Sequence, residues 1–193
     1  MAGHGSFTAL LDANVLYSIA ISDALMGVAI TGIYAAKWTH RIDMEWIRHL
    51  AANRGTSPEK FHYRRDQMHI ACPDWEVPEE CWKQFEEPLN LPDPNDRHVL
   101  AAAIAGHADC IVTCNLRDFP RAALKPFGLE ALHPDEFLHH QLQLDPLVVL
   151  PAFKAMRARC SNPTFSADEF VAAMTRNGLI RTAKFLQAAR DLI

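Results

Sequence analysis

Short apolar runs alternate with helical stretches over the first 143 residues, and this alternation limits the possible folds more than any other feature. Three apolar runs predict buried strands, at Phe7–Leu11, Cys110–Thr113 and Leu129–His133. We also expect a short strand at Pro88–Leu91. The predicted helices are an apolar stretch ending near Gly27, Trp38–Leu50, Pro58–Ala71, Pro78–Phe85, Asp96–Ala105 and one that begins at Pro134. Because strands that alternate with helices usually pair in parallel, the pattern predicts an α/β fold with helices around a parallel sheet.

The last fifty residues have a different pattern, since they contain helical stretches and no strand-like run. The predicted helices are Pro146–Ala158, Ala167–Asn177 and Ile180–Leu192. Ser166 and Glu169 have the spacing of a capping box at the start of the second of these helices. We therefore predict two parts, an α/β domain over residues 1–143 and a helical C-terminal extension over residues 144–193.

Charge is divided unevenly between these two parts. The whole chain has a formal net charge of −4, the segment 144–193 carries +3, and the segment 1–143 carries −7. An acidic domain with a basic extension fits metal binding in the first part and contact with phosphate or a partner in the second. An ordinary solvated helical surface would give the same charge distribution in the extension.

Several features predict a cytoplasmic protein. The chain has no run of about 18 apolar residues, so we expect no membrane span. Its N-terminus has no Lys or Arg before the first apolar run, so we expect no signal peptide. Five cysteines, an odd count, favour reduced thiols. Cys110 and Cys114 would lie roughly 13 Å apart on a strand, too far to share a zinc ion easily, and we interpret them as small buried side chains.

Acidic and amide side chains follow the predicted strands. Asp12 ends the first strand, and Asn115 and Asp118 follow the strand Cys110–Thr113. Asp93 and Asp96 lie just before the helix that ends at Ala105. Each acid alone has an ordinary structural explanation as a helix cap, a first-turn acid or a turn residue. Ligands of open α/β sheets bind beyond the carboxyl ends of the strands, so the joint placement of these acids favours a common site there.

Glu45 is placed unusually for a charged residue. The helical period puts it on one face with Trp38 and Ile42, inside an apolar stripe. A carboxylate in such a place is costly unless it is paired or binds a cation. A structural salt bridge, for example to Arg97, would satisfy it. Together with the acids at the strand ends, however, it favours a ligand of a metal ion.

A cluster of carboxylates indicates a particular chemistry. Neighbouring negative charges raise one another's pKa values, and hard cations that prefer oxygen ligands, Mg²⁺ or Mn²⁺, relieve the repulsion. Two such ions about 4 Å apart can activate water and stabilise the attacking and leaving oxygens of a phosphodiester. The sequence therefore predicts a metal-dependent hydrolase that needs no protein nucleophile.

The chain also resembles a known family, on four segments. These are LLDANVLYS, WTHRIDMEWIRHL, LPDPNDRHVLAAAI and DCIVTCNLRDFP, of which the last two are the most specific. They are similar to the PIN domain, and in particular to the VapC-type toxins of bacterial toxin–antitoxin pairs. The resemblance covers about residues 6–143 and does not extend to the C-terminal helices.

The resemblance implies a doubly wound parallel sheet, magnesium-dependent endoribonuclease activity, a homodimer and inhibition by a small antitoxin protein. The family's metal-binding and catalytic acids would correspond to Asp12, Glu45, Asp96 and Asp118, with Asn115 and Asp93 as further ligands. Asn115 is a departure, because some relatives carry a carboxylate there.

A basic and aromatic segment offers a possible contact with RNA. Lys60, Arg64 and Arg65 could hold phosphates beside aromatic side chains, although part of this helix should face the core. His62 and His69 lie two helical turns apart, and we expect them to be ordinary histidines rather than metal ligands.

Two other functions compete with the ribonuclease. The first is an inert PIN-like scaffold that binds RNA or a protein without cutting. The second is a small-molecule phosphatase, because Asp12 and Asn14 follow a first strand as the Asp-x-Asp pair of the haloacid dehalogenases does. The second position is an amide here, which weakens that chemistry.

Overall fold

A four-stranded parallel sheet forms the centre of the computed structural model, which describes residues 7–161 and 163–193. The strands are β1 (Thr8–Leu11), β2 (Ala35–Lys37), β3 (Cys110–Val112) and β4 (Glu130–Leu132), and their order in the sheet is β2-β1-β3-β4. All three pairings are parallel. The α/β fold predicted from the sequence is confirmed.

One predicted strand is wrong, and one strand had no clear signal. Pro88–Leu91 forms no strand, because Pro88 and Pro92 lack the N–H group that a sheet requires. Leu89 and Leu91 are nevertheless buried, so their apolar character serves packing rather than strand pairing. The fourth strand is instead β2, whose three residues are too few to show a period.

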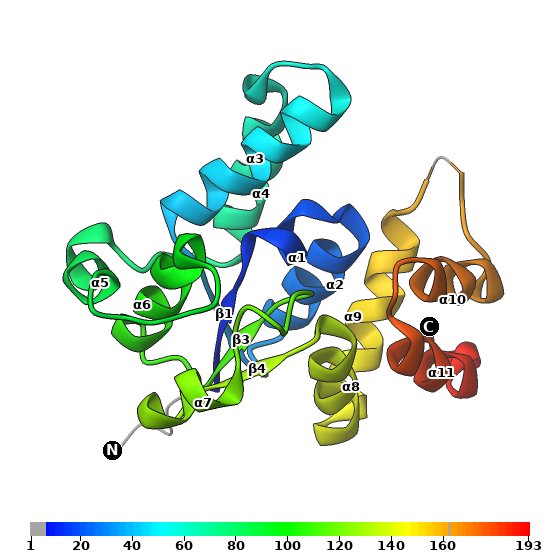
Figure 1. The fold of residues 1–193 in the computed structure, drawn as a ribbon. Coiled ribbons are helices and arrows are strands. Elements are labelled where there is room, and N and C mark those ends of the chain that lie inside the picture. The colour runs from blue at the N-terminus through cyan, green and yellow to red at the C-terminus, as the bar shows by residue number, and fades with distance from the viewer. Residues whose placement is uncertain (1–6, 162) are drawn as a thin grey trace.

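Helices cover the sheet on both sides. In Figure 1, α5 and α6 lie on one side and α1, α2 and α8 on the other, while α3 and α4 project away from the sheet. The helices of this part are α1 (Ala13–Tyr17), α2 (Ile19–Ala29), α3 (His40–Arg54), α4 (His62–Ala71), α5 (Glu79–Glu86), α6 (Arg97–Ala105), α7 (Arg121–Leu124) and α8 (Pro134–Leu144). Short 3₁₀ turns lie at Pro58–Phe61, Pro94–Asp96 and Lys125–Phe127.

Local capping explains two boundaries that differ from the prediction. The apolar stretch after Asp12 is two helices rather than one, because Ser18 has an extended backbone and its side chain accepts from the N–H of Ile21. The next helix begins at His40 rather than Trp38. Thr39 caps it by accepting from the N–H of Ile42 at 3.1 Å. The backbone N–H of Trp38 donates to the Trp75 carbonyl, and its carbonyl accepts from Val77.

The sheet reverses its winding direction between β1 and β3. From β1 the chain crosses to β2 on one side, and then to β3 and β4 on the other. Helices diverge at such a switch point and leave a crevice at the carboxyl ends of the two strands. Asp12 follows β1 and Thr113 follows β3, and the N–H of Asp12 donates to the Val112 carbonyl at 3.1 Å. A ligand site is therefore expected beside these two residues.

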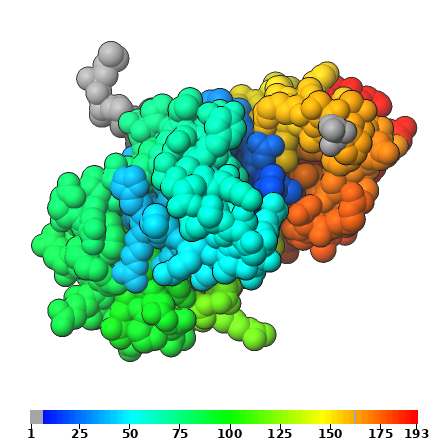
Figure 2. Space-filling model, turned by 90° about the horizontal axis from the view of Figure 1, so that it is seen from above, coloured from blue at the N-terminus to red at the C-terminus, as the bar shows by residue number. Residues whose placement is uncertain are grey.

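The C-terminal part is helical, as predicted. It contains α9 (Pro146–Arg159), α10 (Ala167–Arg176), α11 (Ile180–Ala188) and a 3₁₀ turn at Arg190–Leu192. Ser166 and Glu169 form the predicted capping box. Seen from above in Figure 2, these helices (orange to red) lie beside the cyan α3 and α4, with blue N-terminal residues between them. In the part of the chain that the structure describes, no helix is long and apolar enough to cross a membrane.

A carboxylate of α8 fastens the extension to the rest of the molecule. Asp135 is only 7% exposed, and its two oxygens accept from the backbone N–H groups of Arg181 and Thr182, each at 2.9 Å. These N–H groups lie in the first turn of α11, where no partner exists within the helix. Asp135 therefore caps α11 from another helix and ties the two together.

Candidate metal centre

A cavity of about 350 Å³ lies at the carboxyl edge of β1 and β3. Its lining includes all six residues that the sequence singled out as metal ligands: Asp12, Glu45, Asp93, Asp96, Asn115 and Asp118. They come from four separate segments of the chain. The structure places these side chains together at one edge of the sheet, as expected. Their roles as metal ligands stay predictions.

Asp12 has a helix-capping role and a place in the cavity at once. It is 6% exposed, and its carboxylate accepts from the N–H of Ala13 at 2.6 Å and from the Thr113 hydroxyl at 2.8 Å. Burial raises its pKa above the ordinary value, and the nearby negative charge of Glu45 adds to that effect. The two hydrogen bonds lower its pKa and offset part of the rise. The result is a carboxylate held in one orientation by its neighbours.

Asp96 experiences the strongest crowding of negative charge. Its pKa is raised to about 7, first by desolvation and then by the charges of Asp12, Asp118 and Asp93. The Asn115 side-chain amide donates to the Asp118 carboxylate, which fixes how Asp118 is oriented. Asp93 caps the 3₁₀ turn before α6 by accepting from the N–H of Asn95 at 2.9 Å. The neighbouring carboxylates thus make the charged form of Asp96 less favourable.

Glu45 is paired, but not with the partner that we considered. Its Oε1 lies 2.9 Å from Nε2 of His98 and 3.7 Å from Nε of Arg41. Arg97 does not reach it, and the Arg97 Nε is buried without a hydrogen-bond partner among the described residues. Glu45 therefore lines the cavity while one of its oxygens is already held.

The donor set fits a hard divalent cation. All six candidate ligands offer side-chain oxygen, and no Lys or Arg within residues 7–161 and 163–193 forms an ion pair with Asp12, Asp96 or Asp118. The described part of the chain nevertheless contains no group of three His, Cys, Asp or Glu side chains close enough together to hold an ion. The carboxylates repel one another at full strength when no cation is bound, and this repulsion is a physical reason for the wide spacing between them.

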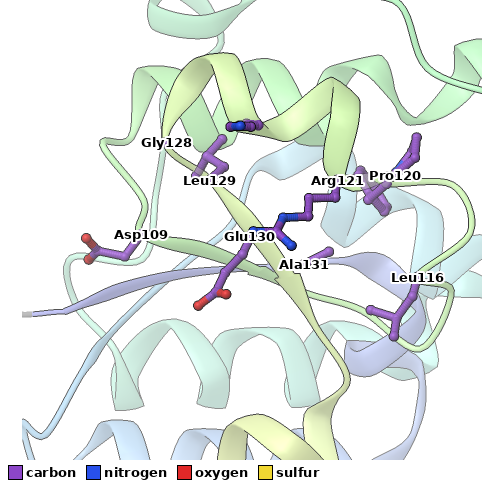
Figure 3. A pocket seen from close by; sticks show the side chains of 10 residues that line it. Asp109, Leu116, Pro120, Arg121, Gly128, Leu129, Glu130 and Ala131 are labelled. Carbon is purple, nitrogen blue, oxygen red and sulfur yellow. The ribbon is translucent and has the colours of Figure 1, made fainter.

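A larger cavity of about 690 Å³ lies beside the edge strand β4. Figure 3 shows the Arg121 side chain extending toward Glu130, whose carboxylate points away from it, with Asp109 at one end and Leu116 at the other. It runs along the outer side of the sheet rather than at the switch point. Because its acids are mixed with Arg121 and Lys125, it lacks the uncompensated negative charge of the first cavity.

The basic residues proposed for RNA contact have different surroundings. Arg64 donates to the Leu16 carbonyl and to the Ser22 hydroxyl, and it lies 4.8 Å from the centre of the Trp46 ring. Through these contacts Arg64 joins α1 and α2 to α4. Burial lowers the pKa of its guanidinium to about 10. Arg65 pairs with Asp66 at 2.7 Å, and Lys60 is exposed.

The histidines and cysteines behave as ordinary structural residues. His69 lies 2.8 Å from the buried Asp43 and stacks on Trp75 with ring centres 3.9 Å apart. Cys110 is buried in β3, Cys114 is exposed, and all five cysteines are free. The prediction of a small buried side chain is confirmed for Cys110 and wrong for Cys114.

Three further residues beside the carboxylates were not predicted as part of the site. Asn14 and Thr113 bracket Asp12: Asn14 donates to both Asp12 and Thr113 and accepts from the N–H of Cys114. Thr113 ends a predicted strand, which was the available signal. His98 had none, since a histidine in an apolar helix resembles a core residue.

Comparison with known proteins identifies the family. A PIN-domain family model matches residues 8–117, which is more than half of the chain. The chain belongs to the PIN-domain family. A second family model, of the VapC50 C-terminal domain, matches residues 134–188, from the start of α8 to the end of α11.

A curated relative supports the same family. It is described as "Putative ribonuclease VapC50" of Mycobacterium tuberculosis (strain ATCC 25618 / H37Rv), and it is 61% identical over 49 residues. The matched stretch covers 25% of this chain and 29% of that protein. No solved structure matches. Five of the six candidate ligands lie within the PIN-domain match: Asp12, Glu45, Asp93, Asp96 and Asn115. The sixth, Asp118, is the first residue after the match.

The Asp96 carboxyl should make the stability of the metal-free protein depend on pH. Its folded-state pKa is about 7, against an ordinary value of 3.8, so the protonated form favours the folded state. This contribution is complete below about pH 4 and is lost as pH rises through about 7. We expect the stability of Asp96→Asn, relative to the unchanged protein in EDTA, to increase from pH 4 to pH 8. Thermal unfolding of both proteins measures this, and a constant difference would contradict the expectation.

Proposed function

We propose that this protein is a metal-dependent endoribonuclease that cleaves RNA phosphodiester bonds and is the toxin of a toxin–antitoxin pair. The observation that carries the proposal is the gathering of carboxylates from four segments at the switch point, where no Lys or Arg of the described residues forms an ion pair with Asp12, Asp96 or Asp118. Membership of the PIN-domain family and the description of the curated relative as a "Putative ribonuclease" support it.

The residues of the cavity would have the following roles. Asp12, Glu45 and Asp96 hold Mg²⁺ or Mn²⁺, and Asp118, Asn115 and Asp93 complete the site. A bound ion supplies positive charge that activates water and stabilises the attacking and leaving oxygens of the phosphodiester.

The chain's own hydrogen bonds prepare these residues. Asp12 is fixed by the N–H of Ala13 and the hydroxyl of Thr113, so it loses little conformational freedom when it binds. Asn115 holds the carboxylate of Asp118 through its amide, which leaves Asp118 able to orient a water molecule. These bonds favour hydrolysis by water over attack by a side chain.

The partners of the protein are part of the same proposal. Its substrate is RNA. The exposed Lys60 can contact the RNA phosphates, and Arg65 can do so once it releases Asp66. A small antitoxin protein inhibits it, it forms a homodimer, and it acts in the cytoplasm. Arg64 belongs to the structural contacts of α4 rather than to this RNA-binding surface.

Cleavage of total bacterial RNA by the purified protein tests the proposal. We expect discrete cuts with Mg²⁺ or Mn²⁺, none in EDTA, and none from the Asp12→Ala variant. Sequencing of the cut ends would also name the target. If antitoxin-free protein cuts no RNA with either metal, the endoribonuclease proposal is wrong.

An inert scaffold is a second candidate, favoured by the pairing of Glu45 and by the spacing of the carboxylates. Thermal unfolding with and without millimolar Mn²⁺ separates the two. A ligand that binds the folded state at 100 times its Kd stabilises it by about 2.7 kcal/mol, which is roughly 5–10 °C for a chain of this size. An unchanged melting temperature would favour the scaffold.

The phosphatase has no comparable support. The Asn14 amide would have to stand where the general acid of a phosphatase stands. Its nitrogen donates to Asp12 and Thr113, and its oxygen accepts from Cys114, so the whole amide is used within the protein.

A further inference from the structure

His98 is a buried polar residue beside the cavity that the proposed mechanism does not use. It lies in the first turn of α6, two residues after Asp96, and it is 1% exposed. A buried imidazole needs a hydrogen-bond partner to offset its loss of water. The partner of His98 is Glu45, at 2.9 Å between Nε2 and Oε1.

The direction of this hydrogen bond follows from chemistry. A carboxylate accepts hydrogen bonds, so the imidazole is the donor and its Nε2 carries a proton. The other ring nitrogen, Nδ1, is buried and has no hydrogen-bond partner among the described residues. The centre of the Trp82 ring lies 6.2 Å from the centre of the His98 ring. Holding Glu45 is therefore the one polar contact that this side chain makes within the described structure.

Arg41 cannot replace His98 in this role. It lies 3.7 Å from Oε1 of Glu45 but 2.6 Å from Oε1 of Glu86, so its closer partner is Glu86. Arg41 is also partly exposed and belongs to the same helix as Glu45. His98 comes from α6, whose N-terminal end carries Asp96. The contact thus links the position of one cavity carboxylate to that of another.

We propose that His98 is a positioning residue that fixes Glu45 for binding a divalent cation. The inference rests on the proposed metal-dependent function. Because His98 holds Oε1, Oε2 of Glu45 is the oxygen left to bind a cation in the cavity. Residues that orient metal ligands typically contribute 10-fold to 100-fold to metal affinity.

Mn²⁺ binding without RNA tests this role, measured by titration calorimetry or by the electron paramagnetic resonance of free Mn²⁺. We expect His98→Leu to raise the Kd for Mn²⁺ about 10-fold to 100-fold. His98→Gln should recover most of the affinity, because its amide N–H can reach the place of Nε2. His139→Leu is the control, because the Nδ1 of the half-buried His139 likewise has no hydrogen-bond partner among the described residues, but His139 lies in α8 and packs on Phe185 of α11. It should leave the Kd unchanged.

A double-mutant cycle separates positioning from packing. Glu45→Gln should weaken Mn²⁺ binding, and adding His98→Leu should weaken it little further, because His98 acts through Glu45. Equal Mn²⁺ affinity of His98→Leu and the unchanged protein would overturn the positioning role and leave the proposed function standing. A His98→Gln variant as weak as His98→Leu would also overturn it. Absence of Mn²⁺ binding by the unchanged protein would overturn both.

Discussion

Replacing Asp96 with asparagine is expected to lower RNA cleavage by about 1,000-fold or more and, at pH 8, to raise the melting temperature of the metal-free protein. The side chain keeps its shape but loses the charge that a divalent cation requires. Loss of one such interaction in a transition state is worth several kcal/mol, and each 1.36 kcal/mol is a factor of ten in rate.

The stability gain has a separate cause. The charged Asp96 is repelled by Asp12, Asp118 and Asp93, and the amide is not. Because the side chain is partly exposed and solvent screens the repulsion, we expect a gain of about 1–2 kcal/mol, or roughly 2–8 °C. This would be a site whose function costs the fold stability.

Cleavage assays and thermal unfolding in EDTA on the same preparations measure both effects. Glu130→Gln is the matched control, because Glu130 is an exposed acid of the β4 cavity outside the metal centre. It should change neither quantity. A fully active Asp96→Asn protein would remove Asp96 from the catalytic group, whatever its stability.

Replacing Asp135 with alanine is expected to destabilise the protein by about 2–4 kcal/mol, or roughly 5–15 °C in melting temperature. The change removes both acceptors from the N–H groups of Arg181 and Thr182. The Thr182 group is buried, so water cannot replace the lost hydrogen bond at low cost. The first turn of α11 should loosen from α8.

Glu136 provides the control for charge alone. It neighbours Asp135 and pairs with Arg181 at 3.6 Å, but both side chains of that pair are well exposed, at 60% for Arg181 and 39% for Glu136. Glu136→Ala should cost less than about 1 kcal/mol. Equal melting temperatures for Asp135→Ala and Glu136→Ala would show that the cap contributes no more than a surface ion pair.

The sequence predicted those parts of the fold that depend on local pattern. β1 and β3 are short, mainly apolar runs, and β1, β3 and β4 were each predicted within two residues of their bounds. β2 was missed because two alanines and a lysine carry no period. Pro88–Leu91 was apolar for packing, and a single sequence cannot distinguish packing from pairing. Both errors concern whether a segment pairs in the sheet, which depends on contacts with the rest of the molecule.

The candidate site divides in the same way. The rule that ligands bind beyond strand ends predicted that Asp12 and Asn115 lie together. For Asp96 the prediction rested on the strand Pro88–Leu91, which does not form, although Asp96 does line the same cavity. The pairing of Glu45 with His98 depends on how α3 and α6 approach each other, and no spacing along the chain encodes that distance. For the same reason Arg64 was expected at a surface, although it is buried among the carbonyls of α1 and α2.

The distribution of tryptophan gives the molecule an internal optical label. All four tryptophans lie between residues 38 and 82, each is buried, and the C-terminal helices contain none. Intrinsic fluorescence therefore follows the unfolding of the sheet-bearing part alone, while far-ultraviolet circular dichroism also follows the helices α9 to α11. Coincident transitions would mean that the two parts unfold as one cooperative unit, and separated transitions would mean that the extension can come loose while the part with the carboxylates stays folded.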